Sequence, residues 1–173
     1  EIAATVAEAH SDWQAGTAVT VSPYTNCGRC ASCLRGRPNA CQFNQTLGVQ
    51  RDGALTEFVT VRADRLYRAD LSIDELCLVE PLTVGFHAAG RGRVMQGDVA
   101  AVIGCGGVGL GAVAGCGFRG ATVIGVDVDD QKLATATMAG ATHTINTAAS
   151  DLHARLAELT GGRGPDVVIE TIG

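Results

Sequence analysis

This sequence of 173 residues has few aromatics, no surplus of basic residues and no long apolar run. Aromatics make up only 4% while Gly contributes 23 residues, a balance typical of α/β domains with tight turns between strands and helices. The formal net charge of −5 argues against a nucleic-acid partner, which would require a basic surface stripe. Because no apolar run is long enough to cross a bilayer, we expect no membrane partner either.

The cysteine usage indicates a reducing compartment. Four of the seven cysteines have metal-ligand spacing, and Cys77, Cys105 and Cys116 stand in apolar or Gly-rich surroundings. Such usage favours a cytoplasmic protein over a disulfide scaffold. Residues 1–10 lack the basic leader and apolar core of a secretion signal. Both ends of the chain have strand patterns, so we expect an internal piece of a longer protein.

The first part of the chain has the pattern of short strands and loops. We predict strands over 2–8, 17–22 and 53–61. A helix is expected over 71–89, with a kink or restart at Pro81. The domain boundary is placed in this helical stretch.

From residue 98 onward, strands alternate with helices. The expected strands are 99–103, 121–127, 142–146 and 166–170. The expected helices end near 116, span 129–139, and run from a cap at Ser150 to about 159. This alternation predicts a parallel sheet with right-handed crossovers.

Four cysteines lie in one short loop with the spacing C-x2-C-x2-C-x7-C: Cys27, Cys30, Cys33 and Cys41. Four thiolates bind Zn²⁺ tetrahedrally and leave no open position, so the predicted zinc site is structural. Disulfides and an iron–sulfur cluster are the alternatives. The ferredoxin run has its fourth Cys after three residues and then a Pro, whereas here the gap is seven residues.

A glycine-rich turn follows the predicted strand that ends at residue 103. Gly104, Gly106 and Gly109 form G-x-G-x-x-G, in which the first Gly permits the turn, the second lets the backbone approach a pyrophosphate and the third lets the helix pack against the strand. The helix N-terminus offers free N–H groups and a positive dipole end. We predict that the turn, with Gly107 and Val108, binds the phosphates of a dinucleotide.

An acidic residue, Asp127, ends the next predicted strand. A carboxylate there can accept both adenosine-ribose hydroxyls and would repel a 2′-phosphate, which predicts NAD over NADP. Asp127 is alternatively a turn or N-cap residue, since Asp129 and Asp130 crowd the same loop. Lys132 is predicted to line the same ribose or, alternatively, to be a solvated surface charge.

With these motifs in order, the chain resembles the zinc-containing medium-chain alcohol dehydrogenases over essentially all of its length. The motifs are the four-Cys loop, DGALTEFV, VEPL, GCGGVG and the strand-end Asp. VEPLTVGFHA and NCGRCASCLRGRPNAC are similar to the polyol and sugar-acid branch, with its sorbitol, idonate and galactonate-type dehydrogenases. The resemblance implies an α/β protein, with a partial GroES-like β domain over 1–78 and a partial Rossmann NAD-binding domain over 79–173.

The resemblance also implies a catalytic zinc in the full-length protein, acting as a Lewis acid on the substrate alcohol. Glu1 aligns with the Glu of the family's Gly-His-Glu motif, although Ala4 stands where the family has Gly. Glu80 stands where classical alcohol dehydrogenases place a zinc-ligating Cys. Glu1 and Glu80 are therefore predicted to lie near the metal, with the Cys and His ligands upstream of this chain. The alternatives are a dipole-stabilised helix residue for Glu80 and a disordered terminus for Glu1.

The expected function is oxidation of a small-molecule secondary alcohol, a polyol or sugar acid, by hydride transfer to NAD. The full-length protein is expected to be a homo-dimer or homo-tetramer, and this fragment to be inactive alone. A threonine, formaldehyde or simple alcohol dehydrogenase of the same superfamily is one alternative. A non-catalytic zinc-binding module is an alternative of another class.

Overall fold

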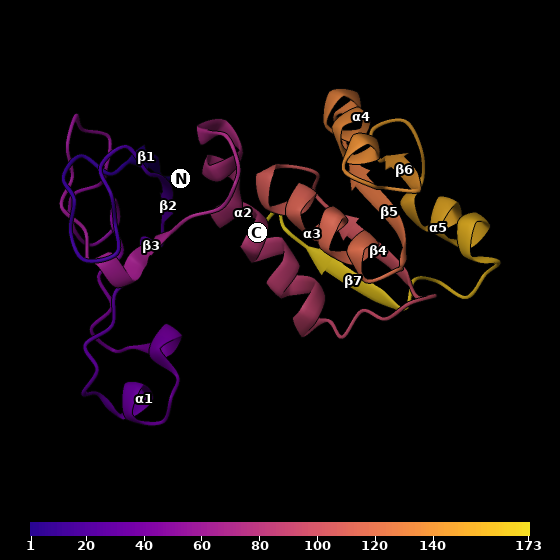
Figure 1. The fold of residues 1–173 in the computed structure, drawn as a ribbon. Helices are drawn as coiled ribbons and strands as arrows, with labels where there is room; N and C mark the ends of the chain where they lie inside the picture. Colours follow the sequence, from indigo (N-terminus) through magenta and orange to yellow (C-terminus); the bar gives the residue numbers. More distant parts are fainter. The chain divides into compact units, whose positions relative to one another are not determined.

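The computed structural model describes residues 1–173 and divides into two compact units, unit 1 (Glu1–Glu80) and unit 2 (Pro81–Gly173). Figure 1 shows the order of the elements along the chain. The boundary between the units lies within helix α2 (Ile73–Arg91), where the division predicted at residues 78 and 79 also falls. No helix of the chain has both the length and the hydrophobicity that a bilayer crossing requires.

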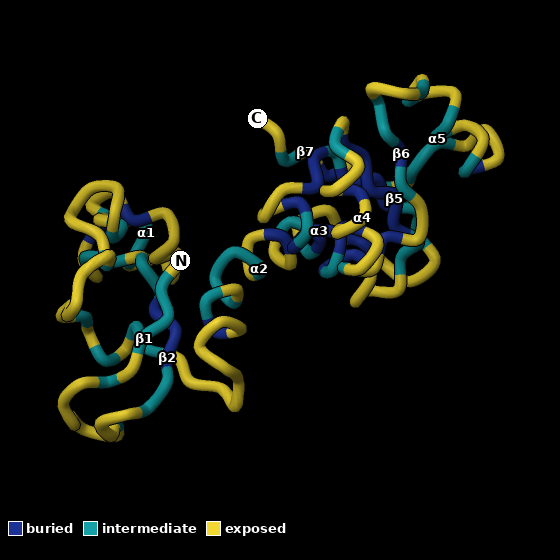
Figure 2. The backbone as a smooth tube through the Cα atoms, turned by 90° about the horizontal axis from the view of Figure 1, so that it is seen from above, coloured by how far each residue is buried: buried dark blue, intermediate teal, exposed yellow.

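Unit 1 contains an antiparallel sheet of three short strands in the order β1-β2-β3. The strands are β1 (Ala3–Thr5), β2 (Ala18–Val21) and β3 (Leu66–Tyr67). Only β2 is buried along most of its length, with Val19 and Val21 almost fully covered (Figure 2). The strands predicted over 2–8 and 17–22 are confirmed in shorter form, whereas β3 was not predicted.

The strand predicted over 53–61 is wrong. These residues adopt no strand, and residues Leu55 and Phe58 are 104% and 71% exposed. A strand is defined by hydrogen bonds to a neighbouring strand, and the sheet of unit 1 consists of β1, β2 and β3 alone. The alternating pattern therefore has no partner to pair with in the described chain.

Helix α2 begins where Ser72 and Glu75 form a capping box. The Ser72 hydroxyl accepts a bond from the Glu75 N–H at 3.3 Å, and the Glu75 carboxylate accepts one from the Ser72 N–H at 2.8 Å. The helix continues through Pro81, so the predicted restart there does not occur. Leu76, on the first turn, is 1% exposed.

Unit 2 is built on a parallel sheet in the order β6-β5-β4-β7. Its strands are β4 (Val99–Ile103), β5 (Thr122–Asp127), β6 (His143–Asn146) and β7 (Val167–Glu170). The intervening helices are α3 (Gly107–Phe118), α4 (Asp130–Met138) and α5 (Leu152–Thr160). The predicted alternation of strands and helices and the parallel sheet are confirmed.

Helices cover both faces of this sheet. Val123 packs in one apolar cluster with residues of α3 and α4, while Ile124, the next residue of β5, packs in another with residues of α5. Successive side chains of a strand point to opposite faces, so β5 contributes to both clusters. The central strands β4 and β5 are consequently the most buried part of the unit (Figure 2).

The second half of α2 and helix α3 approach each other through glycines. A Cβ on Gly85 would lie 2.1 Å from the backbone nitrogen of Ala112, and a Cβ on Gly115 would lie 2.9 Å from the Cα of Phe86. Glycine at these positions permits backbone contact between the helices. The small-residue character of α3 thus reflects packing as well as turn chemistry.

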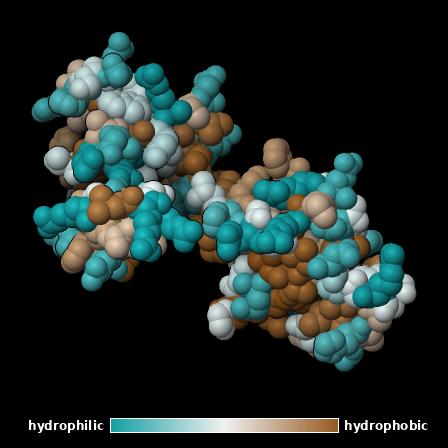
Figure 3. Space-filling model, turned by 90° about the horizontal axis from the view of Figure 1, so that it is seen from below, coloured by the Kyte–Doolittle hydropathy of each residue, from teal (hydrophilic) through white to brown (hydrophobic).

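Strand β7 forms one edge of the sheet, because it pairs only with β4. Val168 in this strand and Ile172 just after it are 58% and 71% exposed. Figure 3 shows hydrophobic side chains gathered on one side of unit 2. The unpaired edge at β7 therefore exposes Val168 and Ile172, with the exposed Glu170 between them in the sequence.

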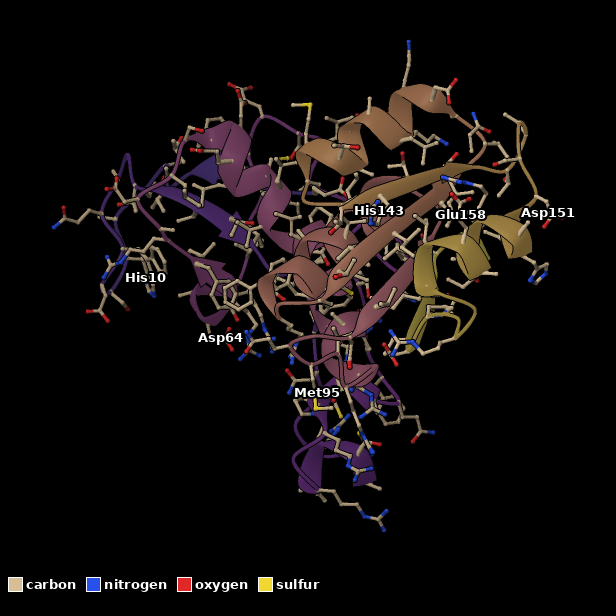
Figure 4. All side chains as sticks on the ribbon, turned by 90° about the vertical axis from the view of Figure 1, so that its right-hand side faces the viewer. His10, Asp64, Met95, His143, Asp151 and Glu158 are labelled. Carbon is tan, nitrogen blue, oxygen red and sulfur yellow. The ribbon has the colours of Figure 1, made fainter.

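Helix α5 is capped by Asp151 rather than by the predicted Ser150. The Asp151 carboxylate accepts a bond from the Ala154 N–H at 2.7 Å, at the helix end seen in Figure 4. The Ser150 hydroxyl instead donates to the Asn146 carbonyl at 2.8 Å. Ser150 therefore closes the turn after β6, and the helix starts one residue later than its predicted cap implies.

Candidate functional site

The four-cysteine loop of unit 1 brings its sulfurs into one cluster. The loop contains a short helix, α1 (Ala31–Leu34), and a 3-10 turn, η1 (Pro38–Ala40). The Sγ atoms of Cys27, Cys30, Cys33 and Cys41 all lie within 4.8 Å of one another. The Sγ of Cys30 lies 3.5 Å from that of Cys33 and 3.9 Å from that of Cys41.

These separations fit a tetrahedral metal site. Four sulfurs about 2.3 Å from a central Zn²⁺ would lie about 3.8 Å apart along the edges of the tetrahedron. A disulfide would bring two sulfurs to about 2.0 Å, and all seven cysteines are free. The cluster is also the only group of three or more Cys, His, Asp or Glu side chains arranged to hold a metal ion. The residues therefore fit structural Zn²⁺.

The protonation preferences of the cluster show why a cation suits it. The backbone N–H groups of Cys33 and Gln42 lower the pKa of Cys30 to about 6. Burial and the hydrogen bond with Cys30 raise the pKa of Cys33 to about 11. Adjacent thiolates resist ionising together, so a bound cation is what would hold all four deprotonated.

The glycine turn of unit 2 follows β4 directly. Gly104 has a φ of +91° and donates its N–H to the Val126 carbonyl at 2.8 Å, which ties the turn to the end of β5. A Cβ on Gly109 would lie 1.9 Å from the carbonyl oxygen of Gly104. At Gly106 and Gly107, by contrast, a Cβ would meet no atom within 4 Å. The turn is closed toward the sheet and open at the helix start.

The open side is where α3 presents its first N–H groups. Helix α3 begins at Gly107 with Gly106 as its N-cap, and neither residue carries a side chain. The first amides of a helix have no partner within the helix, and the dipole is positive there. Backbone amides facing open space at a helix start fit the phosphates of a dinucleotide.

Asp127 lies at the end of β5 and is bonded to the glycine turn. Its Oδ2 accepts the Cys105 N–H at 2.8 Å, and its Oδ1 accepts the N–H groups of Val128 at 2.8 Å and Asp129 at 3.1 Å. The bond from Cys105 is the main cause that lowers the pKa of Asp127, so this carboxylate is ionised near neutral pH. Its side chain is only 8% exposed.

These contacts show that Asp127 stabilises the turn, which was the alternative to its predicted role in ribose binding. A carboxylate has about four acceptor positions, of which three are used here, so capacity for a ribose hydroxyl remains. The Nζ of Lys132 lies 4.0 Å from Oδ1, with the Lys132 side chain half exposed. The ribose roles of Asp127 and Lys132 stay predictions.

A cavity of about 400 Å³ opens beside Asp127, at the carboxyl ends of β4, β5 and β6. Its walls include Val128, Thr147, Ser150 and Ile172. Ligands of open parallel sheets bind outside the carboxyl ends of the strands. The sequence had predicted a helix cap at Ser150 and no role for the other three residues, although Val128, Thr147 and Ile172 all come one or two residues after a strand end.

The two carboxylates predicted to lie near a catalytic metal, Glu1 and Glu80, belong to no cluster of possible metal ligands. Glu1 is exposed, and the Oε1 of Glu80 accepts a bond from the Tyr24 hydroxyl at 2.9 Å. Neither carboxylate joins a group of three possible ligands. Residues 1–173 therefore do not assemble a catalytic zinc site, and the roles of Glu1 and Glu80 stay predictions.

Two protein-family models match the chain. Residues 1–71 match the alcohol dehydrogenase GroES-like domain, and residues 107–173 match the zinc-binding dehydrogenase domain. The first match contains the four-cysteine loop, and the second begins at Gly107, within the glycine turn, and contains Asp127.

Characterised relatives are similar along nearly the whole chain. A sorbitol dehydrogenase of Bacillus subtilis is 38% identical over 100% of this chain and 50% of its own length. An L-threonine 3-dehydrogenase of Bacillus velezensis is 35% identical over 91% of this chain and 46% of its own length. The chain thus spans about half the length of the curated relatives it matches.

Solved structures share the fold. An Escherichia coli oxidoreductase of unknown specificity superposes with a TM-score of 0.90 at 34% identity, covering 98% of this chain and 51% of that one. An alcohol dehydrogenase of E. coli CFT073 complexed with NADH superposes with a TM-score of 0.83 at 30% identity, covering 92% of this chain and 48% of that one. A zinc-binding dehydrogenase of Sinorhizobium meliloti bound to NADP superposes with a TM-score of 0.88 at 31% identity, covering 99% of this chain and 52% of that one.

The resemblance inferred from the motifs is confirmed by these matches. A GroES-like domain with a four-cysteine metal cluster precedes a parallel-sheet domain with a glycine-rich turn, in the order the family models give. The chain therefore belongs to the zinc-type alcohol dehydrogenase family.

Proposed function

We propose that this chain is part of an enzyme that oxidises a secondary alcohol by hydride transfer to NAD. The observation that carries the proposal is the open start of α3 at Gly106 and Gly107, in a turn bonded through Cys105 to Asp127, which lines a cavity. When bound, the nicotinamide supplies the hydride acceptor. The residues of this chain bind the cofactor: the turn from Gly104 to Gly109, which includes Gly107 and Val108, holds the diphosphate.

NAD is favoured over NADP by the charge at the end of β5. Asp127 is ionised, so a 2′-phosphate placed against it would meet a like charge. Lys132 would lie at the rim of the same ribose and partly offset that repulsion. One structural neighbour is bound to NADH and another to NADP, so the choice rests on residues of this chain.

For the substrate, we propose a polyol or a sugar acid. The support is Glu80 within VEPL and the 38% identity to a sorbitol dehydrogenase. Threonine is the alternative substrate, supported by the 35% identity to an L-threonine 3-dehydrogenase. In the longer protein, Glu1 and Glu80 would lie near a catalytic zinc whose Cys and His ligands are supplied upstream.

The four cysteines would hold a second, structural zinc that shapes their loop. A closed Cys₄ set has no position for substrate, so this ion takes no part in the reaction. A non-catalytic zinc-binding module would use the same loop, but it would have no need of the open glycine turn in unit 2. Zinc binding without any affinity for NAD(H) would favour that module.

The test of the proposal is the longer protein assayed with NAD and a panel of alcohols. The panel comprises sorbitol, idonate, galactonate and threonine, with formaldehyde and a simple primary alcohol as comparisons. We expect the NADH absorbance to rise with a polyol or sugar acid. No NADH from any alcohol of the panel would refute the dehydrogenase proposal, whereas turnover of threonine alone would move the substrate assignment to the alternative. Sedimentation of the purified protein would test the proposed dimer or tetramer. Fractionation of the cells that produce it would test the proposed cytoplasmic location.

A further inference from the structure

The peptide unit that joins Gly104 to Cys105 is held on both of its polar groups. Its N–H, on Cys105, donates to the Oδ2 of Asp127 at 2.8 Å. Its carbonyl, on Gly104, accepts from the Thr171 hydroxyl at 3.0 Å. The two partners come from opposite sides, since β5 and β7 flank β4 in the sheet.

The Thr171 hydroxyl is available for this carbonyl. It also lies 3.0 Å from the Ile103 carbonyl, but that oxygen already accepts the Thr171 backbone N–H at 2.9 Å. A hydroxyl has one hydrogen to donate. The Ile103 carbonyl therefore keeps a donor when the hydroxyl hydrogen points to the Gly104 carbonyl, and we place the hydrogen there.

Contacts around the same carbonyl leave the peptide little freedom. A Cβ on Gly104 would lie 2.8 Å from Thr171 Oγ1, and one on Gly109 would lie 1.9 Å from the Gly104 oxygen and 3.1 Å from Thr171 Oγ1. The oxygen is thus enclosed between the backbone of Gly109 and the Thr171 side chain. The orientation of this peptide sets the direction in which the chain enters α3 at Gly106.

We propose that Thr171 is a positioning residue for dinucleotide binding, which fixes the Gly104–Cys105 peptide and through it the amides at the start of α3. The inference rests on the proposed function, because those amides are the ones assigned to the diphosphate. Thr171 itself touches the turn and not the phosphate. Its loss is expected to weaken cofactor binding while leaving the sheet in place.

Thr171→Val removes the hydroxyl at nearly constant shape, and Thr171→Ser restores it. Thr142→Val is the matched control, because the Thr142 hydroxyl accepts the Val123 N–H at 3.2 Å at the amino end of β5, where the strand begins, far from the glycine turn. NADH binding to the longer protein is measured by fluorescence. Loss of one neutral hydrogen bond predicts about five- to tenfold weaker binding for Thr171→Val, near-wild-type binding for Thr171→Ser, and no change for Thr142→Val.

A second measurement needs no cofactor. Hydrogen exchange of the Cys105 amide, which donates to Asp127, should accelerate in Thr171→Val and stay unchanged in Thr142→Val. Equal NADH affinity in wild type and Thr171→Val, or no recovery in Thr171→Ser, would overturn the inference. If the longer wild-type protein binds no NADH, the proposed function fails instead. In that case an unchanged rate of hydrogen exchange at the Cys105 amide in Thr171→Val would by itself overturn the positioning role of Thr171.

Discussion

The backbone N–H of Cys105 donates a hydrogen bond of 2.8 Å to the carboxylate of Asp127. The bond links the second residue of the glycine turn to the last residue of β5, 22 positions further along the chain. It gives one side chain two tasks, since the carboxylate proposed to select the cofactor also holds the turn that would bind it. Changes at Asp127 are therefore expected to affect both stability and binding.

Acidification should reveal the stabilising task. The N–H of Cys105 is the main cause that lowers the pKa of Asp127, so its contribution is fully present above the ordinary carboxyl pKa of about 3.9 and is lost as the pH falls through the folded value. Denaturant titrations between about pH 6 and about pH 3 should show wild-type stability falling more than that of Asp127→Asn.

At neutral pH the same substitution should cost about 2 kcal/mol, because the bonds from N–H groups to a charged acceptor are weakened. Asp129→Asn is the control. Asp129 caps α4 through Gln131 and Lys132, and Asn caps a helix nearly as well as Asp. An equal loss in the free energy of unfolding for Asp127→Asn and Asp129→Asn would contradict the proposed contribution of Asp127 to the glycine turn.

Cofactor preference should also depend on the charge of Asp127. We expect the wild-type chain to bind NAD more tightly than NADP. Asp127→Asn, which removes the repulsion of the 2′-phosphate, should reduce the ratio of the two dissociation constants about tenfold or more. Calorimetric titration with both nucleotides checks this. Lys132→Gln should not improve NADP binding, and tighter binding of NADP by the wild type would refute the assignment of Asp127.

Metal analysis should find about one zinc ion per chain bound by the four-cysteine loop. Cys41→Ser removes one ligand and should abolish this binding at moderate chelator concentration. Cys77→Ser is the control, because Cys77 lies outside the cluster and is also a free thiol. Mass spectrometry of the purified variants gives the metal content. Retention of zinc by Cys41→Ser, or an iron–sulfur absorption spectrum in the wild type, would contradict a structural zinc site.

Two alanine substitutions in the glycine turn should have different effects. At Gly109 a Cβ would meet the Gly104 carbonyl at 1.9 Å, so Gly109→Ala should lower the free energy of unfolding by about 2 kcal/mol or more. At Gly107 a Cβ would meet nothing within 4 Å, so Gly107→Ala should keep its stability. It should still weaken NADH binding, because the new methyl group occupies the open side of the turn. Normal NADH affinity of Gly107→Ala would place the diphosphate elsewhere.

The sequence pattern predicted unit 2 well for a physical reason. Three of its four strands, β4, β5 and β6, are each followed by a turn and a helix, and the neighbours of every strand in the sheet belong to the same stretch of chain. The 53–61 segment shows the opposite case. Its alternation fits a strand, but whether a strand forms depends on a partner, which a local pattern cannot reveal.

The site was predictable in its residue types more than in its contacts. The spacing of Cys27, Cys30, Cys33 and Cys41 was sufficient to predict a cluster, because a short loop leaves few ways to arrange four sulfurs. The bonds from Cys105 to Asp127 and from Tyr24 to Glu80 span 22 and 56 positions. Such contacts depend on the path of the backbone between the partners, so no local pattern predicts them.

The unpaired edge at β7 has a practical consequence for anyone handling this polypeptide. Val168 lies in a strand whose N–H and C=O groups pair on one side only, and such an edge can pair with an extended segment of another chain. Concentrated solutions of the isolated polypeptide are therefore expected to self-associate and precipitate. A charged residue in place of Val168 would be the first change to make for crystallisation.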